Sequence, residues 1–203
     1  MGNPVRDNPL LYILVKLSLV LLCFAFILHY FFANSQLKKP QYESAKAIDS
    51  YKNVLVYNNG PDYTANHGEN FSSDGYYYGL KWQCVEFVKR FYHDVKHVNM
   101  PNGFGNAKDF FDPAVPQGHL NGQRDLLQYR NGGNMEPKPD DILVFTNGLY
   151  GHVAIVTKVT PSSVEIIQQN EKDSRQVLSL TVEHQRFFVG SVTKPAGWLR
   201  KAE

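Results

Sequence analysis

The sequence has little cysteine and almost no excess of either charge. Its 203 residues include only two cysteines, Cys23 and Cys84, which excludes a disulfide-rich scaffold and a four-cysteine zinc site. The 21 Lys and Arg residues nearly balance the 19 Asp and Glu residues, so the chain lacks the strongly basic face typical of nucleic-acid-binding proteins. Charged residues make up 20% and aromatic residues 13%, which excludes a chain that is disordered throughout. No internal repeat is present.

One long apolar run stands near the N-terminus. Residues 17–33 contain no Lys, Arg, Asp or Glu, and with the apolar stretch before Lys16 they are long enough to span a bilayer as a helix. Arg6 and Lys16 favour a cytoplasmic N-terminus and an exported remainder. We therefore expect residues 1–33 to be the anchor of a single-pass membrane protein. The alternative is a cleaved signal peptide, with Ala33-Asn34-Ser35 as the cleavage motif and a secreted product.

The rest of the chain is long enough for one well-buried domain. Cys23 lies inside the apolar run, where it cannot meet Cys84, so Cys84 is a lone thiol in a domain that we expect to be exported. We divide this part into three segments: a tether over 34–54 with a short helix near 42–51, a domain over 55–195, and a C-terminal tail over 196–203.

The hydrophobic period changes along the domain. Residues 57–79 are rich in Asn, Gly, Ser and Tyr and indicate a long irregular segment, in which Tyr76-Tyr77-Tyr78 suggests the lining of a groove. An amphipathic helix is then predicted to begin near Cys84, because apolar residues recur at spacings of three and four at Val85, Val88, Phe91 and Val95. Residues 99–140 carry loop signals, with one short helix near 106–111.

The last third has the pattern of strands. Five runs rich in β-branched and aromatic residues are separated by turn signals, at 141–145, 152–159, 164–170, 176–182 and 187–193. The short connection Pro161-Ser162-Ser163 favours antiparallel pairing of two of them. The predicted fold class is therefore α+β, with helices first and then an antiparallel sheet of about five strands.

Cys84 has the position and the chemistry of a nucleophile. At the start of a helix, unpaired N–H groups and the helix dipole favour a thiolate and so lower the pKa of a thiol. His152 begins a predicted strand and could present its imidazole to that helix start. Gln168 and Asn170 are two residues apart on the neighbouring strand, so either could accept a hydrogen bond from His152 and fix its tautomer. An inert core cysteine and an ordinary histidine are the alternative reading.

At these residues the sequence resembles the CHAP domain family, the cysteine, histidine-dependent amidohydrolases/peptidases. Five blocks match in order: Trp82–Phe87, Gly105–Asp109, Pro139–Phe145, Gly151–Val156 and Gln168–Asn170. The resemblance covers about residues 55–195. The block at Cys84 resembles in particular the amidase domain of glutathionylspermidine and trypanothione synthetase/amidases, whereas the block at 105–109 is more similar to peptidoglycan-cleaving members.

The resemblance implies a papain-like fold and a papain-like mechanism that uses no cofactor. Cys84 would be the nucleophile and His152 the general base, which later protonates the leaving amine. Asn170 or Gln168 would orient His152. Gln83 and the backbone N–H of Cys84 would donate hydrogen bonds to the oxyanion.

Two positions depart from the family pattern. The family commonly has Glu-x-Asn where this chain has Gln168-x-Asn170, so an imidazolium loses an ionic partner. Glu171 is a poor substitute, because on a regular strand its side chain should point away from His152. Asp140 stands where glycine is usual, and this should alter a turn rather than the chemistry.

Three hypotheses follow. The first is an exported, membrane-tethered cysteine amidohydrolase or endopeptidase of a bacterial envelope, with peptidoglycan as the substrate class that the predicted location favours. The second is an amidase for a glutathione–polyamine conjugate. The third, motivated by Gln168, is a catalytically decayed domain that serves as a cell-wall binding module. We expect a monomer without nucleic-acid partners and without a metal, because His93 and His97 have the spacing of a metal pair but no third ligand.

Overall fold

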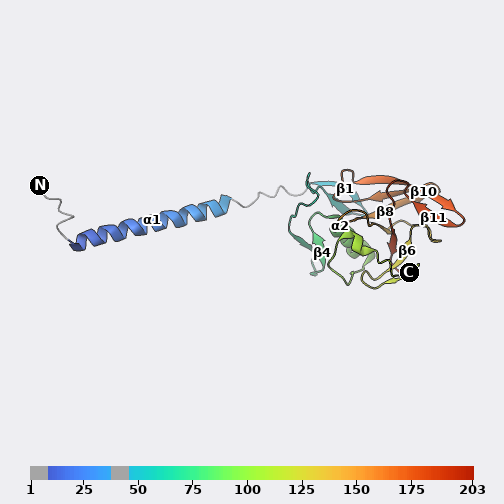
Figure 1. Ribbon diagram of the computed structural model, residues 1–203, viewed down its shortest axis with the longest axis horizontal. Helices are drawn as coiled ribbons and strands as arrows, with labels where there is room; N and C mark the ends of the chain where they lie inside the picture. Colours follow the sequence, from blue (N-terminus) through green and yellow to red (C-terminus); the bar gives the residue numbers. More distant parts are fainter. Residues whose placement is uncertain (1–8, 38–45) are drawn as a thin grey trace. The chain divides into compact units, whose positions relative to one another are not determined.

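The computed structural model describes residues 9–37 and 46–203 (Figure 1). The chain divides into two compact units, one up to Ser44 and one from Ala45 onward. The first contains helix α1, Pro9–Leu37. Within it Tyr12–Tyr30 has a mean hydropathy of 2.3 and no buried residue, so it is long and apolar enough to be a membrane span or a signal sequence.

The second unit begins with a hairpin in the segment predicted to be a tether. Strands β1, Ala47–Tyr51, and β2, Val54–Tyr57, pair antiparallel, and Val54 and Val56 are buried in the core. The helix predicted over 42–51 is therefore wrong from residue 47 onward, and its first residues lie outside the described part. A five-residue strand is too short to show a clear hydrophobic period, which is why the sequence did not reveal it.

Ionic contacts fasten this hairpin to the rest of the unit. Asp140 receives Lys52 Nζ at 2.6 Å and Lys96 Nζ at 2.9 Å, and Asp49 pairs with Arg175 Nε at 2.9 Å. Asp140 has a φ of 76°, a left-handed backbone that suits the glycine usual there. Its carboxylate has thus become the link between the hairpin and the C-terminal end of the next helix.

That helix, α2, runs from Cys84 to Lys96, and its predicted start is confirmed. Phe87, Val88 and Phe91 are fully buried, because the apolar face of the helix packs on the sheet (Figure 1). The helix ends at His97, whose left-handed backbone (φ 53°) closes the last turn. Before α2, two short strands form a hairpin inside the segment predicted to be irregular: β3, Glu69–Phe71, and β4, Tyr77–Leu80. After α2 comes the expected short helix, a 3-10 turn η1 at Ala107–Phe110.

Over the described residues the main sheet has eight strands, and each neighbouring pair is antiparallel. In chain order they are β5 His119–Asn121, β6 Leu126–Arg130, β7 Ile142–Phe145, β8 His152–Thr160, β9 Ser163–Ile167, β10 Arg175–Glu183, β11 Arg186–Val189 and β12 Gly197–Arg200. Their order in the sheet is β11-β10-β9-β8-β7-β12-β6-β5. The α+β class and the antiparallel pairing are confirmed, and the estimate of about five strands is too low.

The strands of the main sheet that the sequence did not predict are short and lie in segments with loop signals or in the predicted tail. β5 and β6 fall in the stretch predicted to be loops, and β12 falls in the predicted C-terminal tail. β12 is a central strand between β6 and β7, with Trp198 and Leu199 fully buried. The tail assignment over 196–203 is therefore wrong for Gly197–Arg200.

The sheet is buried on both faces. Ile142 and Val144 of β7 face the core under α2, whereas Leu143 and Phe145 face a second core with Trp198. The second core needs no helix, because the sheet curls until the segment after β6 pairs with β11, at Gly133 and Phe187. The polar groups described next lie where the start of α2 meets the start of β8.

Candidate active site

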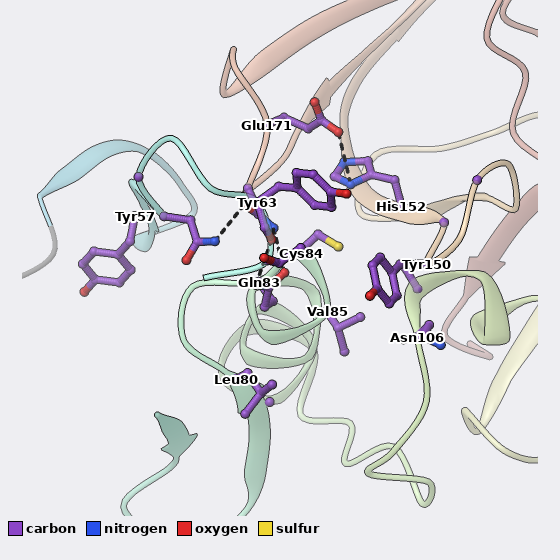
Figure 2. A pocket seen from close by; sticks show the side chains of 18 of the residues that line it. Tyr57, Tyr63, Leu80, Gln83, Cys84, Val85, Asn106, Tyr150, His152 and Glu171 are labelled. Carbon is purple, nitrogen blue, oxygen red and sulfur yellow. Dashed lines mark hydrogen bonds and ion pairs between the residues drawn. The ribbon is translucent and has the colours of Figure 1, made fainter. Parts of the chain in front are cut away.

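The start of α2 meets the start of β8, and this junction brings Cys84 and His152 together (Figure 2). Cys84 is a free thiol with 8% of its surface exposed. A glycine is required just before His152: Gly151 has a φ of 71°, and a Cβ there would lie 2.6 Å from the backbone nitrogen of Lys108. That close approach lets Lys108 N–H donate to Tyr150 O at 2.9 Å, so η1 braces the turn that carries His152.

The surroundings of Cys84 favour its thiolate. Burial raises the pKa of the thiol, but the charge of His152 and a hydrogen bond with its imidazole outweigh burial. The backbone N–H groups of Val153 and Val85 also donate to the sulfur, and the pKa of Cys84 lies below its ordinary value. This is the electrostatic setting of a nucleophilic cysteine.

His152 is held from its far nitrogen by Gln168. His152 Nε2 lies 3.0 Å from Gln168 Oε1, and Gln168 Nε2 donates to the carbonyl of Asp173 at 3.0 Å, which leaves the amide oxygen facing the ring. His152 therefore donates from Nε2 and presents Nδ1 to the thiol side. Burial lowers the pKa of His152, but the thiolate of Cys84, Glu171 and Gln168 together raise it above the ordinary value. The imidazolium is thus the stabilised form.

Asn170, the other predicted orienting residue, has different partners. β9 ends at Ile167, and Asn170 adopts a left-handed backbone with a φ of 65°. Its Nδ2 donates to Gln83 Oε1 at 2.6 Å, and its Oδ1 accepts from Asn59 Nδ2 at 2.9 Å. Gln168 and Asn170 were expected to share a face because the strand was assumed to continue through residue 170. The strand instead ends at Ile167, so the two side chains point to different partners. Of the two, the structure brings Gln168 to His152.

The turn at Asn170 also changes the direction of Glu171. Glu171 Oε1 lies 3.7 Å from His152 Nδ1 (Figure 2). The expectation that Glu171 points away from His152 is therefore wrong. The left-handed residue interrupts the alternation of side chains on which that expectation depended.

Gln83, a predicted oxyanion donor, has its amide nitrogen engaged elsewhere. Gln83 Nε2 donates to the carbonyls of Tyr63 at 3.2 Å and Ala65 at 2.9 Å. Both of its N–H bonds are therefore used to hold the 59–65 loop against the start of α2. The backbone N–H of Cys84 belongs to the first turn of the helix, where no carbonyl one turn earlier is available to it.

A buried ionic network beneath the site was not predicted from the sequence. Glu86 is fully buried and accepts from Arg90 Nε at 2.6 Å, Gln169 Nε2 at 2.7 Å and Asn70 Nδ2 at 2.7 Å. Gln169 also donates to the carbonyl of Gln83 at 3.0 Å. The network therefore ties the turn before Cys84 to the residue next to Gln168. Glu86 and Arg90 stand at i and i+4 in α2, and this spacing was the available signal for the network.

Cys84 and His152 lie in a cleft of about 1520 Å³. Tyr63 and Tyr150 flank the thiol in Figure 2, and both are exposed, by 65% and 44%. Of the predicted groove tyrosines, Tyr77 lines the cleft and Tyr76 stacks on His93 outside it, with ring centroids 5.1 Å apart. The cleft is large enough for a peptide-sized molecule and offers aromatic surfaces beside the thiol.

The part of the chain that the structure describes contains no cluster of three or more His, Cys, Asp or Glu that could hold a metal ion. His93 Nδ1 lies 2.6 Å from Asn99 Oδ1, and His97 forms the C-terminal cap of α2. The side chain of His93 thus has a polar partner, and the backbone of His97 closes the helix.

The comparison with known proteins agrees with this geometry. Residues 74–170 match the family described as the CHAP domain. Trypanothione synthetase of Crithidia fasciculata is 28% identical over 120 residues, 58% of this chain and 18% of the relative. The bifunctional glutathionylspermidine synthetase/amidase of Escherichia coli (strain K12) is 32% identical over 102 residues, 48% of this chain and 16% of the relative. The chain thus spans less than a fifth of the length of these relatives.

A papain-like α+β fold with a thiol and an imidazole at one helix start defines a class of amide-bond hydrolases. Within that class, residues 74–170 match the CHAP domain family, and the resemblance seen in the sequence is confirmed. A CHAP domain implies amidase or peptidase activity.

Proposed function

We propose that this protein is a cysteine amidohydrolase that cleaves peptide-type amide bonds. One observation carries the proposal: Cys84 at the start of α2 shares a hydrogen bond with His152, whose far nitrogen is held by Gln168 at 3.0 Å. The pKa of the thiol is lowered and that of the imidazole is raised, so both shifts favour a thiolate–imidazolium pair. Such a pair is the reactive state of a papain-like enzyme.

The geometry supports an acyl-transfer sequence. The Cys84 thiolate attacks the carbonyl carbon, and the C=O electron pair moves to the oxygen, which the backbone N–H of Cys84 can stabilise. When the pair returns, the C–N bond breaks and the proton on His152 Nδ1 passes to the leaving amine. His152 then takes a proton from water as it attacks the thioester, and the thiolate leaves with the acid product. Gln168 keeps Nδ1 on the reacting side throughout.

For the substrate, peptidoglycan stem peptides or cross-links are our first candidate. The supporting observation is α1, whose apolar stretch is suited to a membrane anchor with the catalytic unit exported. An anchor would hold the enzyme near the cell-wall polymer, and a cleaved signal sequence would release it as a secreted enzyme. In either case the substrate is an amide that reaches an open cleft.

A glutathione–polyamine conjugate is the second candidate. It is supported by the relatives, since the Escherichia coli protein is named as a glutathionylspermidine synthetase/amidase. A third hypothesis, a decayed domain that only binds the wall, is weaker. Gln168 retains a hydrogen bond to His152 despite lacking a carboxylate, so the arrangement needed for turnover is kept.

The test uses the full chain in detergent micelles, offered purified sacculi, soluble muropeptides and glutathionylspermidine in parallel. New primary amines are quantified and the products are identified by mass spectrometry. Release from sacculi or muropeptides alone supports the first candidate, and release of spermidine alone supports the second. Cys84→Ala and His152→Ala should abolish release with an unchanged circular dichroism spectrum. Equal release by Cys84→Ala would refute the mechanism, and binding to sacculi without any release would favour the decayed domain.

A further inference from the structure

The charge balance around His152 is incomplete without a carboxylate. Gln168 is a neutral amide, so on the Nε2 side the ring has a hydrogen-bond acceptor but no counter-charge. On the Nδ1 side the Cys84 thiolate supplies one, and this charge moves away to the substrate oxygen when sulfur bonds to the substrate carbon. From that moment until the leaving amine is protonated, a further negative group near the ring would stabilise the imidazolium.

Glu171 is placed to be that group. Its Oε1 lies 3.7 Å from Nδ1, which is too long for a hydrogen bond but within the range of an ionic interaction. Among the described residues no other carboxylate lies within ion-pair distance of His152. The side chain of Glu171 is 48% exposed, so its carboxylate can remain solvated and charged beside Nδ1.

The position is set by the backbone. Asn170, with a φ of 65°, turns the chain after β9, and its side chain is fixed by Gln83 Oε1 at 2.6 Å and by the carbonyl of Tyr63 at 2.8 Å. The residue that follows this anchored turn is therefore delivered to the cleft rather than left on a free loop.

We propose that Glu171 is the ionic partner of His152, a positioning residue that stabilises the imidazolium during acyl transfer and keeps its proton on Nδ1. The inference rests on the proposed function and names a further residue for the same site. Among the described residues, the polar groups that interact with the ring are Cys84 from α2, and Gln168 and Glu171, which follow β9. The ring of Phe145 in β7 is an apolar neighbour, with its centroid 6.1 Å from that of His152.

The experiment compares wild type with Glu171→Gln, which removes the charge but keeps the shape, and Glu171→Asp, which keeps the charge. Glu183→Gln is the matched control, since Glu183 is exposed at the end of β10 and does not line the cleft. Two readouts are taken on the full chain in micelles. One is the pH profile of kcat/KM. The other is the NMR titration of the His152 ring, identified by its absence in His152→Ala.

Loss of a charge at this distance from a partly exposed ring should lower turnover about three- to tenfold on the alkaline side of the profile. Glu171→Gln should move the alkaline limb and the His152 titration to lower pH, because the imidazolium loses a stabilising charge. Glu171→Asp should lie between Glu171→Gln and wild type, and Glu183→Gln should match wild type.

Superimposable His152 titrations in wild type and Glu171→Gln would overturn the inference, as would an equal shift in Glu183→Gln. The NMR readout needs no substrate. A wild type that cleaves nothing would therefore refute the proposed function while the titration still decides whether Glu171 acts on His152.

Discussion

Removal of the buried Glu86 carboxylate should strongly destabilise the second unit. Glu86 is fully buried, and Arg90, its partner at 2.6 Å, has only 10% of its side chain exposed. In Glu86→Ala the guanidinium keeps the carbonyl of Leu55 at 2.9 Å but loses its only nearby counter-charge among the described residues. An uncompensated buried charge of this kind costs about 3–5 kcal/mol. Domains of this size are stable by roughly 5–15 kcal/mol, so the variant should be close to unfolding.

Urea unfolding followed by tryptophan fluorescence measures this loss. Both tryptophans, Trp82 and Trp198, lie in the second unit, so the signal reports that unit and not α1. Glu183→Ala, an exposed control, should change the free energy of unfolding by no more than about 0.5 kcal/mol. Replacing both Glu86 and Arg90 with methionine should recover much of the loss, because no charge is then left unpaired. A loss below about 1 kcal/mol in Glu86→Ala would refute the view that this network holds the start of α2.

Two further predictions concern the site itself. Alkylation of Cys84 by iodoacetamide, followed at the peptide level to separate it from Cys23, should have its pH midpoint below the ordinary thiol pKa of about 8.5. The midpoint should move to higher pH in His152→Ala, because the charge and hydrogen bond of His152 lower the pKa of this thiol. An unchanged midpoint in that variant would contradict this cause. Gly151→Ala should lower turnover at least about tenfold, because a Cβ 2.6 Å from Lys108 N must displace the turn that carries His152. If Gly151→Ala turned over substrate as fast as wild type, η1 would not set the position of His152.

The parts of the fold that the sequence predicted are apolar runs bounded by turn signals. The start of α2 at Cys84 and the strands β7 to β11 were each signalled by such a run. β1 to β6 and β12 lie in segments that carry loop signals or were assigned to the tether and the tail, and there the tertiary contacts decide the conformation. The large sheet could therefore be recognised as antiparallel, but the number of its strands could not be predicted.

At the site, the sequence was sufficient to predict which residues take part, but it was insufficient to predict how their side chains are oriented. The approach of Cys84 to His152 follows from a helix start and a strand start, which are readable positions. The orientations of Asn170, Glu171 and Gln83 depend on one left-handed backbone and on which carbonyls lie nearby. No local pattern contains that information, because it belongs to the packing of the 59–65 loop against α2.

The central place of β12 has a consequence for the order in which the protein can fold during synthesis. The strand that joins β6 to β7 is made of residues 197–200, so until these have left the ribosome β6 and β7 have no common neighbour in the sheet. α1, in contrast, is complete after the first 37 residues. Any cellular component that binds α1 as it emerges therefore meets a nascent chain whose main sheet still lacks β12.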